Sequence, residues 1–453
     1  MMPSQTPERS QLLRQLSLLD SIMINAGVMI GSAIFLVPAT IAQQVETPWL
    51  MLAVWLVAGL LSLCGALAFA ELSAMMPASG GAVVYLSEAY HPFWGYLYGW
   101  TVFAVIQTAS IAAVAVALAT YVGYFIALTP WMIKLISILI ILFLSWLNGL
   151  GVKQGAHMQN VSTLLKVGLL LIIIVACLIG PREGVADFST WWPATPQTTL
   201  LSQFGLAIMA ALWAYDGWIS ITYVGGEVRQ PDRFLPRSIT FSVLIVIVLY
   251  ALVNLAYSIS LPMASMAQSE RVAATAVQQA VGPWGGALVA LAVIVSCWAA
   301  VNGMILSGGR VYYAMAVEGL FFKRLASLHP TRHTPVASLY VQGLWASLIA
   351  LTGTYDQLFT YVIFDSWFFY AMGGAAVLIL RHKQPDRARA YRTWGYPYVP
   401  ILFVGLSLVL LINTLVSDPR DASIGIGIAL LGVPGYIAWS KKPVMSEPPL
   451  QRQ

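Results

Sequence analysis

The feature that most constrains this chain is its series of long apolar segments. A helix needs about 20 apolar residues to cross the hydrocarbon core of a bilayer, and windows of that length give twelve candidates in the sequence. Lipid cannot satisfy a free N–H or C=O group, so we predict an all-α integral membrane protein with twelve transmembrane helices. The predicted spans cover residues 18–43, 50–75, 92–125, 131–150, 158–180, 200–225, 236–261, 283–314, 336–354, 357–380, 397–417 and 423–440.

The composition supports this class. Hydrophobic residues make up 59% of the chain and charged residues 9%, whereas a soluble domain carries about 25% charged residues. The net charge of +5 arises from basic residues between the spans, which indicates membrane topology rather than nucleic-acid binding. The first residues, MMPSQTPERSQLLRQ, are polar, and the apolar segment after them is too long for the core of a signal peptide.

The lysines and arginines predict the orientation of the spans, because basic residues accumulate in cytoplasmic loops. When both termini are placed in the cytoplasm, most of the 23 basic residues fall on that side. Only Lys134, Arg182, Arg271 and Arg420 fall outside, and Lys166 lies within a span. We therefore expect both termini to be cytoplasmic.

Two of the spans are interrupted near their middle. The first break is Gly31-Ser32-Ala33 in the span 18–43, and the second is Ala214-Tyr215-Asp216-Gly217 in the span 200–225. Interruptions of this kind are tolerated in a membrane where the exposed backbone lines a cavity. Each lies in the first span of a block of five, which is typical of an inverted-repeat transporter with its site at the midplane.

The two breaks together suit a zwitterion. The positive end of the helix that follows the first break favours a carboxylate, and the carbonyl groups that end the helices before the breaks favour an ammonium group. The alternative is that Gly27 and Gly31 form a helix-packing Gly-xxx-Gly pattern. The second break, which contains Asp216, favours the site, because an intramembrane aspartate is rare unless it faces the protein interior.

Several ordered motifs resemble the amino acid–polyamine–organocation superfamily, and within it the L-type amino acid transporters of the bacterial serine/threonine exchanger branch. The motifs are GSAIF (31–35), AELSAMMPASGGAVVYLSEAY (70–90), LWAYDGWISITYVGGEVRQPDRFLPRSI (212–239), SCWAAVNGMILSGGRVYYAMAVEGLFFKRLASLHPTRHTP (296–335) and RHKQPDRARAYRTWGYPYVP (381–400). The resemblance covers essentially the whole chain. It implies sodium-independent amino acid exchange by alternating access, with the first and sixth helices moving against a scaffold.

The resemblance also implies the fold and its division. The expected fold is a LeuT-like five-plus-five inverted repeat with breaks in its first and sixth helices, plus two extra C-terminal helices. We expect a cytoplasmic N-terminal segment, two repeats, a final helix pair and a cytoplasmic tail; these cover residues 1–17, 18–180, 200–380, 397–440 and 441–453.

The family pattern assigns the substrate contacts. The resemblance implies that the carboxylate binds at Gly31, Ser32 and Ala33, and the ammonium group at the backbone carbonyls of Met29, Trp213 and Asp216. The third small residue of the first motif is usually glycine and here is Ala33. Its methyl group predicts a narrower approach to the backbone and a narrower substrate range.

Two ionisable residues within spans are further candidates. Lys166 lies too deep for simple snorkelling, and the resemblance implies that it occupies the place of a sodium ion and links the fifth and first helices. Asp365 departs from the family pattern and could tune substrate choice, take part in proton coupling or be a structural hydrogen bonder. Asp216 could instead pair with a cationic substrate, or its carboxylate could cap the unwound segment.

The remaining candidates line the expected pocket and its inner face. The predicted side-chain pocket contains Gln107, Tyr215, Trp218, Asn302 and Met304, a neutral lining that favours small or medium neutral amino acids. Three charged residues near cytoplasmic ends of spans could form gating ion pairs or be solvated charges at helix ends: Glu71, Glu227 and Arg310.

Other functions lack their signals in this sequence. Neither HExxH nor GxSxG is present, so we expect no enzyme, metal or cofactor. Two broken helices suit an occluded site better than a channel, while proton-coupled symport and a non-transporting amino acid sensor stay open as alternatives. We read Cys64, Cys177 and Cys297 as packing residues. The resemblance implies that some animal relatives bind a heavy chain through a cysteine in the outer loop after the third helix. The corresponding loop here, ALTPW (127–131), has no cysteine, so we expect no disulfide-linked heavy chain and a bacterial inner-membrane location.

Overall fold

The computed structural model describes residues 12–180, 187–193, 197–352, 355–417 and 419–440. Helices account for all the regular elements of this part of the chain, apart from an isolated bridge between Leu16 and Val228. The N-terminal half contains α1 (Leu18–Met29), α2 (Ala33–Gln44), α3 (Pro48–Met75), α4 (Ala82–Ala89), α5 (Pro92–Thr101), the π-helix η1 (Val102–Ile106), α6 (Gln107–Val122), α7 (Pro130–Gly149) and α8 (Val152–Ile179).

The C-terminal half continues the same pattern of long helices. It contains α9 (Gln197–Ala214), α10 (Ser220–Tyr223), the 3-10 helix η2 (Gly225–Glu227), α11 (Pro231–Ser260), α12 (Met263–Gln268), α13 (Val272–Val281), α14 (Trp284–Val317), the 3-10 helix η3 (Lys323–Ala326), α15 (Val336–Thr352), α16 (Tyr355–Lys383), α17 (Tyr398–Ser417), α18 (Pro419–Leu430) and α19 (Gly432–Ser440).

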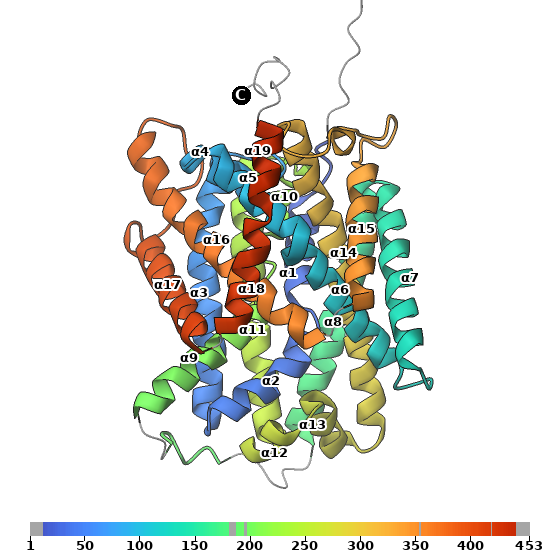
Figure 1. Cartoon of the computed structure of the whole chain (residues 1–453). Coiled ribbons are helices and arrows are strands. Elements are labelled where there is room, and N and C mark those ends of the chain that lie inside the picture. Colours follow the sequence, from blue (N-terminus) through green and yellow to red (C-terminus); the bar gives the residue numbers. More distant parts are fainter. Residues whose placement is uncertain (1–11, 181–186, 194–196, 353–354, 418, 441–453) are drawn as a thin grey trace, which may run out of the picture.

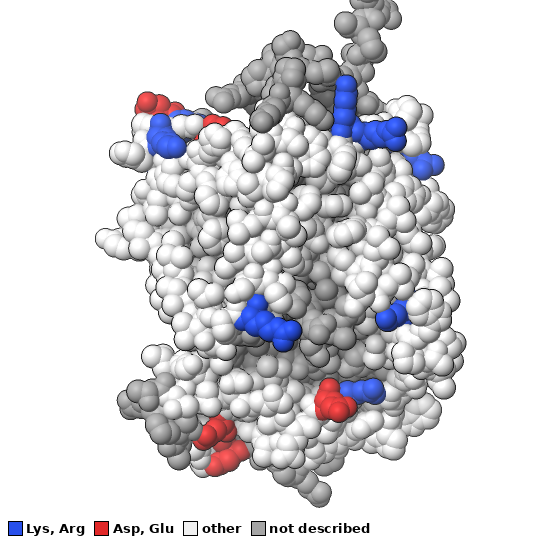
Figure 2. Space-filling model, in the orientation of Figure 1, with Lys and Arg blue, Asp and Glu red and all other residues white. Residues whose placement is uncertain are grey.

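The chain is an all-α membrane protein, as the sequence predicts. Among the described residues, nine helices are long and apolar enough to cross a membrane, and ten if the pair α1 and α2, bent by 42°, is one span. The other two predicted spans coincide with shorter apolar helices, α9 and α15. In Figure 2 most of the charged side chains on the visible face lie toward its two ends, and a broad uncharged band separates them.

Three short helices lie where the sequence analysis placed loops. α4 lies between α3 and α5, and α12 and α13 follow α11. In Figure 1 α4 lies at the upper end of the bundle, and α12 and α13 lie at the lower end. Windows of about 20 residues miss such elements because they are too short to cross a membrane.

Helices α8, α11 and α14 surround α1 in the middle of the bundle. α14 packs against α6, α8 and α1, and α8 packs against α1. Alanines and glycines on α6 and α14 allow this close approach, since small residues let helix backbones come together. α7 and α17 lie at the two sides of the bundle in Figure 1 and bury few of their side chains. The core therefore surrounds α1 and the point where it ends.

Candidate functional site

The first interruption lies between α1 and α2. The last regular bond of α1 joins Ile30 N to Ala26 O at 2.9 Å, after which Gly31 N donates to Met29 O at 2.9 Å. Because the final carbonyls of a helix lack intrahelical donors, they need partners from elsewhere. α2 then starts at Ala33, and its first N–H groups and positive dipole end face the interruption.

Lys166 of α8 donates hydrogen bonds to carbonyl groups at the end of α1. Its ammonium group is buried and donates to Gly27 O at 2.5 Å and to Ile30 O at 2.6 Å. Ile30 O also accepts the hydroxyl of Ser296 in α14, at 3.1 Å. The lysine therefore lies in the interior and links α8 to the end of α1, so it does not snorkel to the membrane surface.

The second interruption lies between α9 and α10. α9 ends at Ala214, Asp216 N donates to Trp213 O at 3.0 Å, and Ser220 N donates to Gly217 O at 3.0 Å. Gly217 adopts a φ of 102°, which side-chain-bearing residues rarely adopt. A Cβ atom there would lie 2.4 Å from Val28 Cγ1, so the second interruption lies directly against α1.

One tyrosine joins the two interruptions. The hydroxyl of Tyr250 in α11 lies 2.8 Å from Met29 O and 3.0 Å from Ala214 O. A hydroxyl group carries a single proton, so the two carbonyls share one donor. Tyr250 is fully buried and therefore holds the ends of α1 and α9 at a fixed separation.

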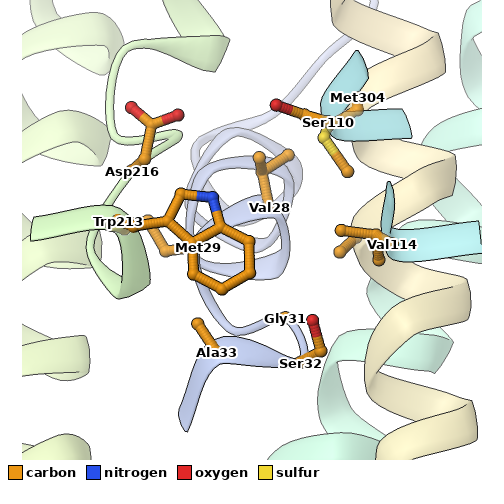
Figure 3. Close-up of a pocket in the computed structure, with 11 residues that line it drawn as sticks. Val28, Met29, Gly31, Ser32, Ala33, Ser110, Val114, Trp213, Asp216 and Met304 are labelled. Carbon is orange, nitrogen blue, oxygen red and sulfur yellow. The ribbon is translucent and has the colours of Figure 1, made fainter. Parts of the chain in front are cut away.

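A small cavity lies between the two interruptions (Figure 3). Its volume is about 40 Å³, which is room for about three water molecules. In Figure 3 the ring of Trp213 extends across the cavity toward α1, and Ser110 and Val114 face it from the opposite side. The lining consists of Val28, Met29, Gly31, Ser32, Ala33, Ser110, Val114, Trp213, Asp216, Ala300 and Met304.

The cavity brings together all six predicted backbone positions and Met304. The sequence analysis missed Ser110 and Val114, which follow Gln107 at helical spacing on α6 and were open to detection from that periodicity. Ala300 was missed because a small apolar residue in a span carries no signal of its own.

Four residues predicted for the side-chain pocket have their side chains engaged elsewhere. Gln107 Nε2 donates to Met304 O at 2.7 Å, and the Tyr215 hydroxyl donates to Trp55 O at 3.1 Å. The Trp218 ring packs edge-on against Phe69. Asn302 Nδ2 donates to Gln159 Oε1 at 2.8 Å and to Gly155 O at 3.2 Å, and so connects α14 to α8. None of the four contributes to the lining of this cavity.

The carboxylate of Asp216 is held away from the first interruption. It accepts the hydroxyl of Tyr370 in α16 at 2.7 Å, and Figure 3 shows it pointing away from Ser32 and Ala33. Its carboxylate therefore fastens the second interruption to α16. Nearby, the hydroxyls of Tyr98 and Tyr223 form a short hydrogen bond.

Asp365 lies outside the cavity lining. Its side chain is buried, and its Oδ1 atom would lie 3.0 Å from a Cβ atom at Gly425 of α18. Its Oδ2 atom has no hydrogen-bond partner within the described part of the chain. This position connects Asp365 with the contact between α16 and α18 rather than with the two interruptions.

The three predicted gate residues form buried ion pairs, so the alternative of solvated charges at helix ends is wrong. Arg310 donates from Nε to Glu227 Oε2 at 2.7 Å and from Nη2 to Glu227 Oε1 at 3.1 Å. Glu71 accepts from Arg381 at 2.8 and 2.7 Å and lies 3.3 Å from Arg389 Nε. The carboxylates cannot be solvated, because Glu71 and Glu227 are each only 1% exposed.

The cysteines agree with a packing role. Cys177 and Cys297 are buried and Cys64 is partly buried, and all three carry free thiols. Over the ranges that the structure describes, no group of three or more His, Cys, Asp or Glu side chains could hold a metal ion.

An all-helical membrane protein whose central cavity lies at interrupted helices is typical of secondary transporters. Comparison with known proteins agrees with this class. The amino acid permease family model matches residues 16–439, and the chain belongs to this family.

The relatives are membrane transporters of similar length. The serine/threonine exchanger SteT of Bacillus subtilis is 33% identical over 96% of this chain and 99% of its own. The b(0,+)-type amino acid transporter 1 of the mouse is 32% identical over 90% of this chain and 84% of its own. The human cystine/glutamate transporter is 31% identical over 97% of this chain and 89% of its own.

Proposed function

We propose that this protein is a sodium-independent exchanger of small or medium neutral L-amino acids that works by alternating access. The observation that carries the proposal is the cavity bordered by both interruptions, which offers groups of opposite polarity. The similarity of the chain to a serine/threonine exchanger over nearly the whole of both chains supports the substrate class.

The substrate carboxylate binds at Gly31, Ser32 and Ala33, where the N-terminus of α2 favours a negative charge. The ammonium group binds the carbonyls of Met29, Trp213 and Asp216, which end or follow the helices before the interruptions. A zwitterion between these two sets neutralises both, which neither a cation nor an anion alone does.

The size and lining of the cavity select the side chain. The cavity is small, which favours a small substrate. Val28, Val114 and Met304 are apolar, and Ser110 adds one hydroxyl. This lining suits a short neutral side chain.

Lys166 replaces a sodium ion in this proposal. A fixed ammonium group bound to Gly27 O and Ile30 O supplies the positive charge that a bound cation would supply at the end of α1. Because the charge is part of the chain, substrate binding needs no sodium gradient. In this proposal the protein changes between its outward-open and inward-open states only when an amino acid occupies the site, so it exchanges one amino acid for another.

The architecture completes the proposal. Twelve helices form a five-plus-five inverted repeat with interruptions at α1/α2 and α9/α10, the repeats cover 18–180 and 200–380, and two further helices cover 397–440. The segments 1–17 and 441–453 lie in the cytoplasm of a bacterium, and the protein lies in its inner membrane without a disulfide-linked heavy chain. The ion pair of Glu227 with Arg310 and that of Glu71 with Arg381 close the cytoplasmic side.

A counterflow assay tests this function. Proteoliposomes are loaded with one unlabelled amino acid from a panel, and entry of labelled L-serine is measured with sodium, without sodium and across a pH gradient. We expect entry only with internal serine, threonine, alanine or a similar neutral amino acid, and equal rates with and without sodium. Entry into empty vesicles driven by a pH gradient would instead support a proton symporter.

A further inference from the structure

A row of polar side chains on α8 runs along the length of α1. Asn160, Thr163 and Lys166 are spaced three residues apart on α8, and each donates a hydrogen bond to α1. Their acceptors on α1 are the side chain of Asp20 and the backbone carbonyls of Met23, Gly27 and Ile30. We call this row of bonds the α8 ladder.

The rungs of the α8 ladder differ in strength. Asn160 Nδ2 donates to Asp20 Oδ1 at 2.6 Å, and Thr163 Oγ1 donates to Met23 O at 3.2 Å. Lys166 makes two short bonds to backbone carbonyls and Asn160 makes one short bond to a carboxylate, whereas Thr163 makes a single longer bond between neutral groups. The strong rung therefore lies at the interruption, and the weakest lies one turn before it.

Close contact between α1 and α8 depends on Gly27. A Cβ atom there would lie 1.9 Å from Gln159 Nε2 and 2.5 Å from Thr163 Oγ1. Gln159 in turn accepts from Asn302 of α14, so the polar face of α8 is fixed from behind. The α8 ladder is therefore a close-packed contact between α8 and α1, and α8 is held on its other side by α14.

The start of α1 is fastened to a second partner. Gln15 N and Leu16 N donate to Glu227 O at 2.8 and 2.9 Å, and Arg229 N donates to Leu16 O at 2.9 Å. These bonds attach α1 to the segment that follows the second interruption. When the two interrupted helices move together, this attachment travels with them, whereas the bonds from Asn160 and Thr163 to α1 have to break.

We propose that Asn160 and Thr163 are positioning residues that latch α1 against α8, and that Lys166 is the pivot about which α1 swings when the latch opens. The proposal rests on alternating access as the proposed function. Release of the Asn160 and Thr163 rungs frees the part of α1 before the interruption, while the two bonds of Lys166 keep the substrate-binding end in place. Asp20 also caps α1 by accepting from Ser17 N and Oγ at 2.8 and 2.7 Å, so the helix keeps its start when the latch opens.

A cysteine reporter beside the latch tests this role. Ala156 is a buried residue of α8, one turn before Asn160, and it lines a pocket together with Ser17 and Asp20, so Ala156→Cys places a thiol beside the start of α1. The protein in lipid nanodiscs is treated with a membrane-impermeant maleimide, and wild-type protein gives the background from Cys64, Cys177 and Cys297. The second substitution is either Thr163→Val, which removes the hydroxyl, or Thr163→Ser, which keeps it.

We expect Thr163→Val to raise the labelling rate at position 156 about fivefold, the effect of one neutral hydrogen bond on an equilibrium, and Thr163→Ser to label like the parent. Equal rates for the valine variant and the parent, or equally raised rates for both substitutions, would overturn the latch. If the valine variant does not fold, Asn160→Ala carries the same expectation and the same refutation.

Labelling does not require transport, so it separates the latch from the proposed function. A protein that shows the labelling difference but no counterflow with any neutral amino acid would refute exchange and retain the latch. A protein that exchanges normally but labels equally in all variants would refute the latch and retain exchange.

Discussion

The two interruptions around the cavity are fastened in different ways. At the first, the carbonyls of Gly27 and Ile30 are bound by the buried ammonium group of Lys166. At the second, the Asp216 carboxylate and the Ala214 carbonyl are bound by neutral tyrosine hydroxyls. The first interruption is therefore held by a lysine amino group as well as by the Tyr250 hydroxyl, and we expect it to be the less easily displaced half of the site.

The largest effect is expected when the charged fastening is removed. Lys166→Met removes the donor of Gly27 O and leaves Ile30 O with the Ser296 hydroxyl alone, and each lost hydrogen bond from a charged group costs about 1.5 kcal/mol or more. We expect the counterflow rate to fall at least about a hundredfold, which is the rate change that corresponds to the loss of both bonds.

Lys134→Met is the matched control for this substitution. Lys134 also donates its ammonium group to a helix carbonyl, that of Leu351 at 2.6 Å, but this bond joins α7 to α15 and does not involve α1. Its substitution should leave counterflow close to wild type. Equal losses in the two variants would show that Lys166 acts as ordinary packing and that the two interruptions are fastened alike.

A second comparison uses the glycines of the two interruptions. Gly217→Ala forces a residue with a side chain into a φ of 102° and places its Cβ atom 2.4 Å from Val28. Backbone strain of this kind costs about 1–3 kcal/mol. We expect a lower melting temperature of the purified protein.

Gly31→Ala is expected to fold normally. Its Cβ atom would meet only Ala300 Cβ, at 3.7 Å, which is an ordinary contact. Thermal unfolding of the two variants in parallel measures the difference. A Gly31→Ala protein as unstable as Gly217→Ala would mean that the first interruption is packed as tightly as the second.

The bond that joins the two interruptions should matter less than either fastening. Tyr250→Phe removes one hydroxyl shared by Met29 and Ala214, and we expect the exchange rate to drop about fivefold. Tyr257→Phe on the same helix is the control, because the Tyr257 hydroxyl has no hydrogen-bond partner within the described residues. Unchanged exchange in Tyr250→Phe would disprove a coupling through this residue.

The smallest effect is expected at Ala33, which lines the cavity on the side of the first interruption. Ala33→Gly removes one methyl group, and space for one methyl or methylene contributes about 0.8 kcal/mol. We expect relative uptake of leucine over alanine to rise about fourfold. Initial rates for the two labelled amino acids give this ratio, and an unchanged ratio would contradict the role of Ala33 in narrowing the site.

The six backbone positions predicted for the site all line one cavity. Small residues and an aspartate within apolar spans identified positions 29–33 and 213–216, because a membrane helix is interrupted only where protein or a cavity can satisfy its backbone. The side-chain half was predicted poorly. Gln107 and Asn302 are polar residues in spans, but they hydrogen-bond to neighbouring helices instead of facing the cavity. Which way a polar side chain turns depends on tertiary packing, and no single span contains that information.

The same distinction holds for the fold. Long apolar windows identified the helices that cross the membrane, whereas α4, α12 and α13 are short and lie at the ends of the bundle. The ion pair of Glu227 with Arg310 joins residues 83 positions apart. A charge near the end of a span predicts a gate or a solvated residue equally well, so only the three-dimensional contact decides between them.

The most direct test of the central claim is an experimental structure of the protein with bound L-serine in sodium-free buffer. We predict the serine between the two interruptions, with its carboxylate at Gly31, Ser32 and Ala33, its ammonium group near the carbonyls of Met29 and Trp213, and Lys166 still bound to Gly27 O and Ile30 O. Serine bound away from both interruptions, or a site that fills only when sodium is added, would contradict the account.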